Sequence, residues 1–309
     1  MPYLADLTIR LAAGVGELPE ATRARHAGYL KARQNDDGGY SGREGASDLY
    51  YTGFALRGLA LTGELQGPVA EKAAGFLRRQ LERQVAIIDF LSLVYGAMLL
   101  ENSAGIDVFA DAAPGWRDAV AAALERYRRP DGGYAKTDEG ASSSTYYTFL
   151  MVLCNELIGR PLVEPERIAA FVRSRQREDG GFVELGPMQK SGTNPTAAAA
   201  GLLKILAAFD DETRAAVIDF VADMQTDEGG LRANTRIPIA DVLSTFTGLL
   251  TLNDLGARDE VDLAAVGRYV RSMELPDGGF LGGAWDEATD VEYTFYGLGA
   301  LALLETPEG

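Results

Sequence analysis

An acidic residue followed by two glycines occurs five times in this chain of 309 residues, at nearly regular intervals. The glycine pairs begin at residues 38, 132, 180, 229 and 278. The last three intervals are therefore 48, 49 and 49 residues, and the first, 94 residues, is close to two such steps. A constant period of this length is typical of repeat proteins, in which each repeat is one small supersecondary unit. The chain is predicted to fold as an array of repeats.

The unit that lacks its turn can be located from its downstream half. The segment Asp89-Phe-Leu-Ser-Leu-Val-Tyr-Gly96 aligns without a gap with Asp290-Val-Glu-Tyr-Thr-Phe-Tyr-Gly297. The chain therefore contains six repeats of about 48 residues, one of which has lost its glycine pair.

Each repeat is predicted to contain two helices. The segments before the turns are amphipathic, with apolar residues every three or four positions among charged ones, which indicates half-exposed outer helices. These segments are Glu20–Gln34, Pro68–Gln84, Trp116–Arg129, Pro165–Gln176, Asp211–Gln225 and Asp262–Met273. The segments after the turns are apolar on nearly all sides, which indicates buried inner helices. These are Tyr50–Leu61, Phe90–Leu100, Tyr146–Leu157, Thr196–Ala208, Val242–Leu252 and Val291–Leu304.

These two sets of segments predict an all-α fold, with six inner helices around an axis and six outer helices around them. Such a fold is an α-α toroid, and it is expected to form one domain over residues 1–309. The Asp-Gly-Gly turns are expected to supply positive φ angles where the outer helices end. No segment has the alternation of a β-strand.

Composition excludes several classes of function. The formal net charge is −16, which argues against nucleic acid and anionic membrane surfaces as partners. No run reaches the ~18 apolar residues of a membrane span, and Met1–Gly14 has no secretory signal pattern. The single cysteine, Cys154, rules out an internal disulfide. A cytoplasmic protein is expected.

The turns also carry a family resemblance, in Gln34-x-x-Asp37-Gly-Gly-Tyr40, Gln176-x-x-Asp179-Gly-Gly-Phe182 and Pro276-Asp277-Gly-Gly-Phe280. With the helix start Asp290-Val-Glu-Tyr-Thr, they make essentially the whole chain similar to protein prenyltransferase β subunits and squalene/terpene cyclases. The single ring resembles the β subunit more than the two-domain cyclases. The resemblance implies an isoprenoid ligand in a central apolar cavity, and a possible α-subunit-like protein partner or homo-oligomer.

The resemblance also locates the zinc site of the prenyltransferases, where this chain departs from the family. The aligned positions hold Asp241, Leu243 and Tyr293, so the cysteine and the histidine of the family site are missing. Cys154 lies inside an inner segment and the sole histidine, His26, in an outer one. We therefore expect no zinc cofactor, and Mg²⁺ only together with a diphosphate. The cyclase motif Asp-x-Asp-Asp is absent as well.

Six equivalent positions start the inner helices, and they are expected to surround the mouth of the cavity. They are Asp48, Asp89, Ser144, Gly192, Asp241 and Asp290. Asp241, Asp290 and Tyr293 are the candidates for catalysis, and Asp48, Asp89, Tyr51 and Tyr147 for ligand binding. The alternative is that these Asp and Ser side chains only cap helix N-termini.

Further ligand contacts are expected from loop cations and cavity aromatics. Lys190, Arg232 and Arg236 follow the turns and could bind an anion, or could merely balance nearby carboxylates. Phe246 and Tyr296 belong to an aromatic set opposite the small residues 196–201, which would leave room for an isoprenoid chain. The alternative is that the small residues only let helices pack closely.

The resulting hypothesis is a bacterial, zinc-independent prenyltransferase-like protein that binds an isoprenoid and transfers or modifies it. Whether it is an enzyme stays open. One alternative is a non-catalytic scaffold that binds a protein, and another is an α-α toroid glycosidase that uses paired carboxylates.

Overall fold

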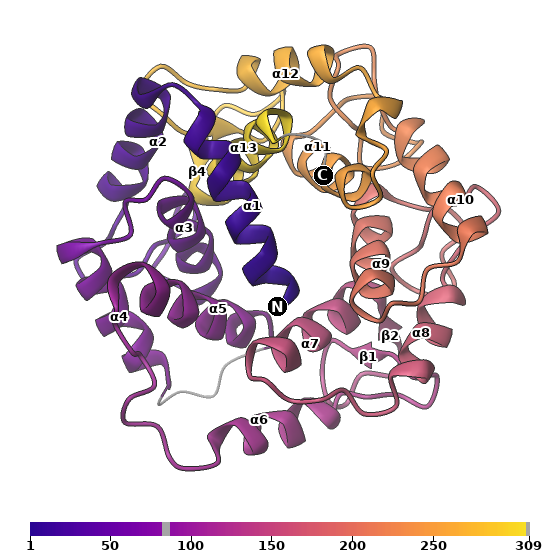
Figure 1. Cartoon of the computed structure of the whole chain (residues 1–309), viewed down its shortest axis with the longest axis horizontal. Coiled ribbons are helices and arrows are strands. Elements are labelled where there is room, and N and C mark those ends of the chain that lie inside the picture. Colours follow the sequence, from indigo (N-terminus) through magenta and orange to yellow (C-terminus); the bar gives the residue numbers. More distant parts are fainter. Residues whose placement is uncertain (82–86, 307–309) are drawn as a thin grey trace. The chain divides into compact units, whose positions relative to one another are not determined.

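The computed structural model describes residues 1–81 and 87–306 (Figure 1). In each repeat within these ranges, a helix before the turn alternates with a helix after it. The first set is α2 (Glu20–Ala32), α4 (Gly67–Leu81), α6 (Trp116–Glu125), α8 (Pro165–Arg173), α10 (Asp211–Ala222) and α12 (Leu263–Ser272). The second set is α3 (Leu49–Leu61), α5 (Ile87–Ala104), α7 (Thr145–Leu157), α9 (Thr193–Ile205), α11 (Val242–Asp254) and α13 (Val291–Glu305). The twelve predicted helices are confirmed, although residues 82–84 of the second predicted segment lie outside the described ranges.

The two sets differ in burial as the hydrophobic patterns predict. In α6 only Leu124 is buried, whereas α13 buries ten residues between Val291 and Leu303. The helices that follow the turns therefore form the core. Within the described ranges, no helix is both long and apolar enough to cross a membrane.

One helix was not predicted. α1 (Tyr3–Glu17) precedes the first repeat and buries Leu7, Leu11 and Val15, which are spaced by four residues. It packs on α13 and α3. A Cβ added at Gly14 would lie 2.2 Å from the carbonyl oxygen of Ala302, so glycine permits this close approach of α1 to α13.

Two pairs of short strands and a 3₁₀ helix were also not predicted. Two antiparallel pairs of two-residue strands occur in the described chain, β1 (Tyr134–Ala135) with β2 (Ser143–Ser144) and β3 (Phe280–Leu281) with β4 (Thr289–Asp290). A 3₁₀ helix spans Arg258–Glu260. The strands are too short for alternation to be visible in sequence. Because β2 and β4 run directly into α7 and α13, the pairs fix where those helices begin.

The glycine turns have the predicted conformation. The first glycine of each pair has φ between 83° and 96°, a region that favours glycine. A Cβ at Gly180 would lie 2.3 Å from the carbonyl oxygen of Ala216 in α10, the helix that precedes the next turn. After four of these pairs, the next residue donates its backbone N–H to a buried threonine of the following helix, as Phe182 does to Thr196 at 2.9 Å. The turns thus combine chain reversal with close helix packing.

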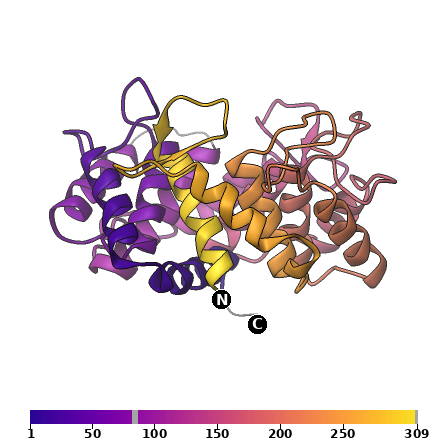
Figure 2. The same cartoon turned by 90° about the horizontal axis from the view of Figure 1, so that it is seen from above.

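The described chain forms two compact units. Unit 1 comprises residues 1–81, 87–114 and 270–306, and unit 2 comprises residues 115–269. In unit 1, α3 packs against α5 and α13. The β3–β4 loop lies at one end of α13, drawn in yellow, and α1, drawn in indigo, lies near the other (Figure 2). In unit 2, α9 lies between α7 and α11.

Candidate functional site

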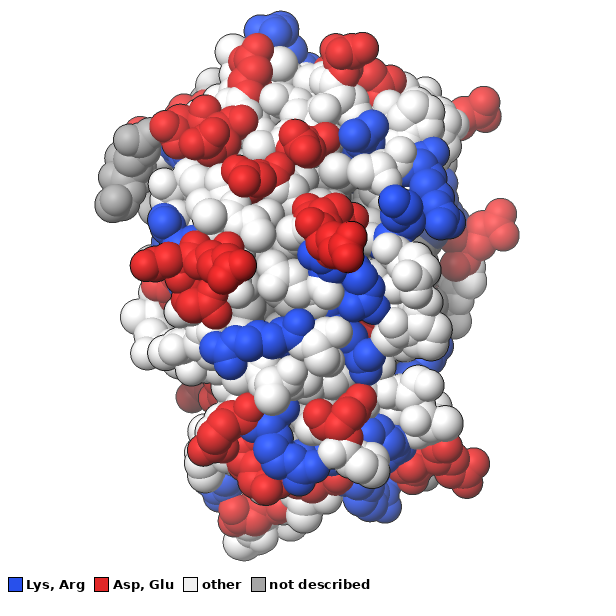
Figure 3. All heavy atoms as spheres, turned by 90° about the vertical axis from the view of Figure 1, so that its right-hand side faces the viewer, with Lys and Arg blue, Asp and Glu red and all other residues white. Residues whose placement is uncertain are grey.

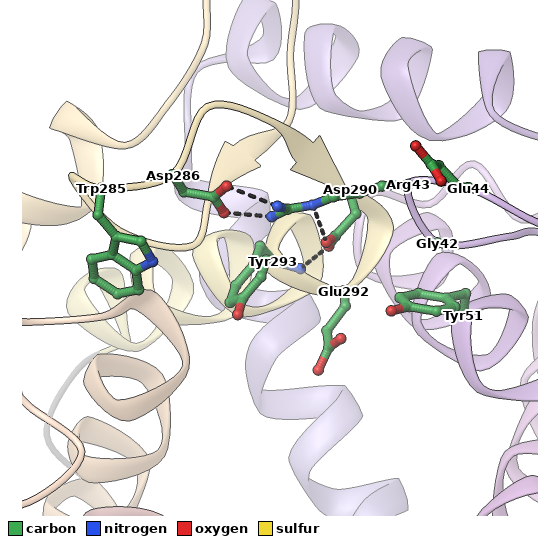
Figure 4. Close-up of a pocket in the computed structure, with 9 residues that line it drawn as sticks. All are labelled: Gly42, Arg43, Glu44, Tyr51, Trp285, Asp286, Asp290, Glu292 and Tyr293. Carbon is green, nitrogen blue, oxygen red and sulfur yellow. Dashed lines mark hydrogen bonds and ion pairs between the residues drawn. The ribbon is translucent and has the colours of Figure 1, made fainter.

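Arg43 and two carboxylates form an ion-pair cluster at the start of α13. Arg43, in the loop before α3, donates from its two terminal nitrogens to both oxygens of Asp286, one of them at 2.8 Å. Its Nε lies 3.3 Å from Oδ2 of Asp290. The other oxygen of Asp290 accepts the backbone N–H of Tyr293 at 2.9 Å, which caps α13 (Figure 4). Residues far apart in the sequence are thus joined by one guanidinium.

This cluster lines an open pocket of about 470 Å³ within unit 1. The pocket contains one arginine and four carboxylates among its walls. Its lining residues are Gly42, Arg43, Glu44, Tyr51, Trp285, Asp286, Asp290, Glu292 and Tyr293 (Figure 4). The pocket is therefore acidic and partly aromatic.

The two carboxylates bound by Arg43 have different pKa shifts. Burial alone would raise the pKa of Asp286, but hydrogen bonds from Arg43, Gly282 and Ala288 bring it below its ordinary value. For Asp290, which is 6% exposed, burial dominates and the pKa is raised despite the N–H of Tyr293 and the charge of Arg43. Both oxygens of Asp290 already accept hydrogen bonds, so this carboxylate is held in place by the protein itself.

Glu292 lies in the first turn of α13 and connects the pocket with the interior of unit 1. Its Oε1 accepts a 2.6 Å hydrogen bond from the hydroxyl of Tyr50. Burial raises the pKa of Glu292, and the bond from Tyr50 opposes that shift. Nothing in the sequence indicated that these two residues form a pair, because the contact joins α3 to α13.

An aromatic face begins beside Glu292. It consists of Tyr50, Phe54, Phe295 and Tyr296, whose ring centres are 5.0–5.6 Å apart in tilted and edge-to-face pairs. Phe54 and Phe295 are buried, and Tyr50 and Tyr296 are partly exposed. Its geometry is the one that aromatic rings prefer. Arg57 of α3 lies against this face, with its guanidinium 4.7 Å from the ring centre of Phe54. An arginine inside an otherwise apolar helix was the sequence signal for this cation, and the sequence interpretation did not use it.

Comparisons with known proteins agree with this architecture. The family model described as prenyltransferase alpha-alpha toroid domain matches residues 11–89 and 71–308. The chain belongs to this family. No curated protein sequence gives a significant match.

Solved structures with similar folds have different activities. Candida albicans protein geranylgeranyltransferase-I in complex with GGPP matches with a TM-score of 0.73 and 15% identity, over 91% of this chain and 90% of that one. A type II terpene cyclase from Scytonema, with bound geranylgeranyl dihydroxybenzoate, matches at 0.63 and 14%, over 98% and 99%. An alpha-1,6-mannanase from Salegentibacter matches at 0.62 and 11%, over 92% and 98%. At these identities the likeness shows the fold alone.

The zinc ligands of a prenyltransferase-type toroid have no equivalent set among the described residues. No group of three His, Cys, Asp or Glu side chains there is placed to hold a metal ion. His26 is fully buried between Glu274 and the backbone N–H of Gly279. The thiol of Cys154 is buried inside α7, and burial raises its pKa, which disfavours the thiolate that binds metal. The residues present therefore do not fit the zinc site.

The helix-start positions act as N-caps, as the alternative interpretation held. The side chains of Asp48, Ser144, Asp241 and Asp290 each accept the backbone N–H three residues on. Asp89 differs, since it lies in the first turn of α5, which begins at Ile87. Capping accounts for the placement of these side chains.

The predicted site residues divide between the two units. Unit 1 contains Asp48, Tyr51, Asp89, Asp290, Tyr293 and Tyr296, and the pocket brings together Tyr51, Asp290 and Tyr293. Unit 2 contains Tyr147, Lys190, Arg232, Arg236, Asp241 and Phe246. Their roles in catalysis and binding stay predictions.

The loop cations of unit 2 were expected to bind an anion or to balance carboxylates. Lys190 and Arg236 are exposed, and Arg232 donates to the carbonyl oxygen of Asp223 at 3.1 Å. Basic and acidic side chains are interspersed on the face in Figure 3. Ion pairs in this unit include Arg160 with Asp118 at 2.5 Å and Arg175 with Asp131 at 3.1 Å. Charge balance is thus the role that the contacts support for many of the basic residues here.

Proposed function

We propose that this protein binds an isoprenoid or a similar apolar chain against the aromatic face of unit 1, with one end of the chain at the acidic pocket. The observation that carries the proposal is the continuity of this face with the pocket through Glu292, which lines the pocket and bonds to Tyr50. Aromatic rings suit an unsaturated hydrocarbon chain because they offer large apolar contacts. The geranylgeranyl ligands of the two family relatives support the same ligand class.

The charge of the pocket limits the polar group that it accepts. One arginine faces four carboxylates there, and Arg43 is already paired with Asp286 and Asp290. A free diphosphate would be repelled by this charge unless Mg²⁺ accompanied it. The proposal is therefore zinc-independent binding, with a neutral polar group at the pocket favoured over a bare diphosphate.

If the protein also modifies its ligand, Glu292 is the residue placed for proton transfer. It touches both the pocket and the aromatic face, and its pKa is raised by burial, so a protonated carboxyl is available nearer to neutral pH than usual. Glu292→Gln is expected to bind ligand and to form no product. Product analysis by gas chromatography with geranylgeraniol tests this, and product from the glutamine variant would exclude Glu292 as the acid.

Native mass spectrometry with farnesol, geranylgeraniol and geranylgeranyl diphosphate, with and without Mg²⁺, tests the binding proposal. We expect a 1:1 adduct with the alcohols, and with the diphosphate only when Mg²⁺ is present. Tyr296→Ala removes a partly exposed ring of the aromatic face and should weaken alcohol binding about tenfold. Trp116→Ala, on α6 of unit 2, is the matched control and should bind as the wild type does. Absence of any adduct would overturn the proposal and favour the scaffold alternative.

A further inference from the structure

Arg57 lies in the middle of α3 with its guanidinium against three aromatic rings. The guanidinium carbon is 4.7 Å from the ring centre of Phe54, 4.8 Å from Tyr95 and 5.8 Å from Phe295. These rings belong to α3, α5 and α13, so the cation is held where three helices of unit 1 meet. The attraction between a cation and the face of an aromatic ring contributes to this placement.

The hydrogen-bonding capacity of this guanidinium is not met by the protein. Its Nε is buried and has no hydrogen-bond partner, and no described side chain forms an ion pair with it. The hydroxyl of Tyr95 is bonded instead to Thr8 and to the carbonyl oxygen of Leu4. A guanidinium has five N–H donors, and a buried donor without an acceptor is unfavourable. An acceptor from a ligand would remove this cost.

Four other arginines of the described chain lie over aromatic rings; Arg33 and Arg117 are exposed to solvent, and the remaining two show the contrast. Arg43, over Tyr293, is paired with Asp286 and Asp290. Arg175, over Phe171, also has a buried Nε without a hydrogen-bond partner, but its Nη2 is paired with Asp131 at 3.1 Å. Each of these cations has its carboxylate within the protein, whereas Arg57 has none. The charge of Arg57 acts on Glu292 at longer range, but the nearer oxygen partner of Glu292 is Tyr50.

We propose that Arg57 is the receptor for a carboxylate carried by the ligand, so that the ligand is an apolar chain ending in a carboxylate. The inference rests on the proposed function and narrows its ligand class. The planar fork of a guanidinium matches the two oxygens of a carboxylate. Arg57 lies seven residues beyond Tyr50, which is about 10 Å along the helix axis. The anion is thereby separated from the carboxylates of the pocket, and the apolar chain lies along the aromatic face between them.

Calorimetric titration with farnesoic acid and farnesol at pH 8 tests the inference, because the two probes share the chain and differ in the charged group. The wild type is expected to bind the acid at least about tenfold more tightly than the alcohol. Arg57→Met should lose this preference, measured as the ratio of the affinities for the acid and the alcohol. Arg57→Lys should retain part of the preference, since lysine keeps the charge and loses the fork. Arg175→Met makes the same chemical change at a paired arginine and should keep the full preference.

The possible outcomes separate this inference from the function on which it rests. Equal binding of both probes by the wild type, or a preference that survives Arg57→Met, would show that Arg57 is only a contact between helices. Binding of neither probe would overturn the proposed function together with the inference. If Arg57→Met does not fold, as judged by circular dichroism, the lysine variant decides: an undiminished preference would contradict the role of the guanidinium fork.

Discussion

The hydroxyl of Tyr50 donates a 2.6 Å hydrogen bond to Oε1 of Glu292, and this bond joins the first turn of α3 to the first turn of α13. The two residues are 242 positions apart in the chain. The bond lies between the acidic pocket and the aromatic face, so it connects the two parts of the candidate site. It also stabilises the ionised form of a carboxyl whose pKa burial raises.

Tyr50→Phe should therefore raise the pKa of Glu292 further and destabilise the protein by about 1 kcal/mol. The bond favours the ionised carboxylate of Glu292, which predominates only above its raised pKa. The loss of stability caused by Tyr50→Phe should therefore be larger at pH 8 than at pH 4. Denaturant unfolding at the two pH values measures the cost, and carbon-detected NMR titration measures the pKa. An equal cost at both pH values would show that the bond does not act on the charge of Glu292.

Arg43→Met should leave Asp286 and Asp290 without their shared cation. The pKa of Asp286, now below its ordinary value, should rise, and that of Asp290 should rise further. Because Arg43 is 40% exposed, the loss of stability at pH 7 should be only about 1 kcal/mol. The loss should shrink toward pH 3 as both carboxyls become protonated. Adding Asp286→Asn should recover part of the stability, and no recovery would contradict the pairing.

His26 should make stability fall in mild acid. Burial and the charge of Arg25 lower its pKa from 6.5 to about 4. A depressed pKa means that the unfolded chain takes up a proton before the folded one, so stability is lost as pH falls from 6.5 toward 4. The loss should reach about 2 kcal/mol at pH 5.

His26→Gln should remove this part of the pH dependence in urea unfolding measured between pH 7 and pH 5. Its stability at pH 7 should be lower, because the ring of His26 stacks on Phe280 with centres 4.7 Å apart. A variant with the pH slope of the wild type would show that another group titrates.

Gly180→Ala should be strongly destabilising, by about 3 kcal/mol or more. The alanine would have to adopt a φ of 83°, and its Cβ would lie 2.3 Å from the carbonyl oxygen of Ala216. Gly45→Ala is the matched control, with a φ of 98° and no atom within 4 Å of the added Cβ. It should cost only about 1–2 kcal/mol, the strain of the backbone alone. Similar costs for the two variants, in thermal unfolding, would mean that the helix contact adds nothing.

Asp241 allows capping to be separated from a role at a site. Asp241→Ala should cost about 1 kcal/mol, since the bond from the N–H of Ser244 at 2.6 Å is lost. Asp241→Asn keeps a capping oxygen and removes a buried carboxyl whose pKa is raised, that is, whose charged form is disfavoured by burial. This variant should therefore be at least as stable as the wild type at pH 7. If the asparagine variant also binds geranylgeraniol normally, Asp241 is a cap and no more. A loss of binding at full stability would support the predicted site role.

The repeat period and the hydrophobic patterns were sufficient to predict the helices that follow each turn, and the turn glycines to predict their φ angles. They could not reveal α1, because it precedes the first repeat and has no equivalent segment elsewhere in the described array. They also gave no sign of the two strand pairs, which are two residues long and are set by the turns beside them. For the candidate site, the helix-start positions included Asp290, Tyr293 and Tyr51, which line one pocket. These positions gave no indication of Arg43 as their partner, of Glu292 or of Arg57.

The sequence by itself determined the repeat, the order of the helices, which of them are buried and the family. These follow from local periodicity and from the conformational freedom of glycine, both of which are properties of short segments. Only the tertiary structure decided that Arg43 is neutralised by Asp286 and Asp290, while Arg57 has aromatic neighbours and no carboxylate. The physical reason is that the charge state and the availability of a side chain depend on neighbours from other helices, which no segment of the sequence contains.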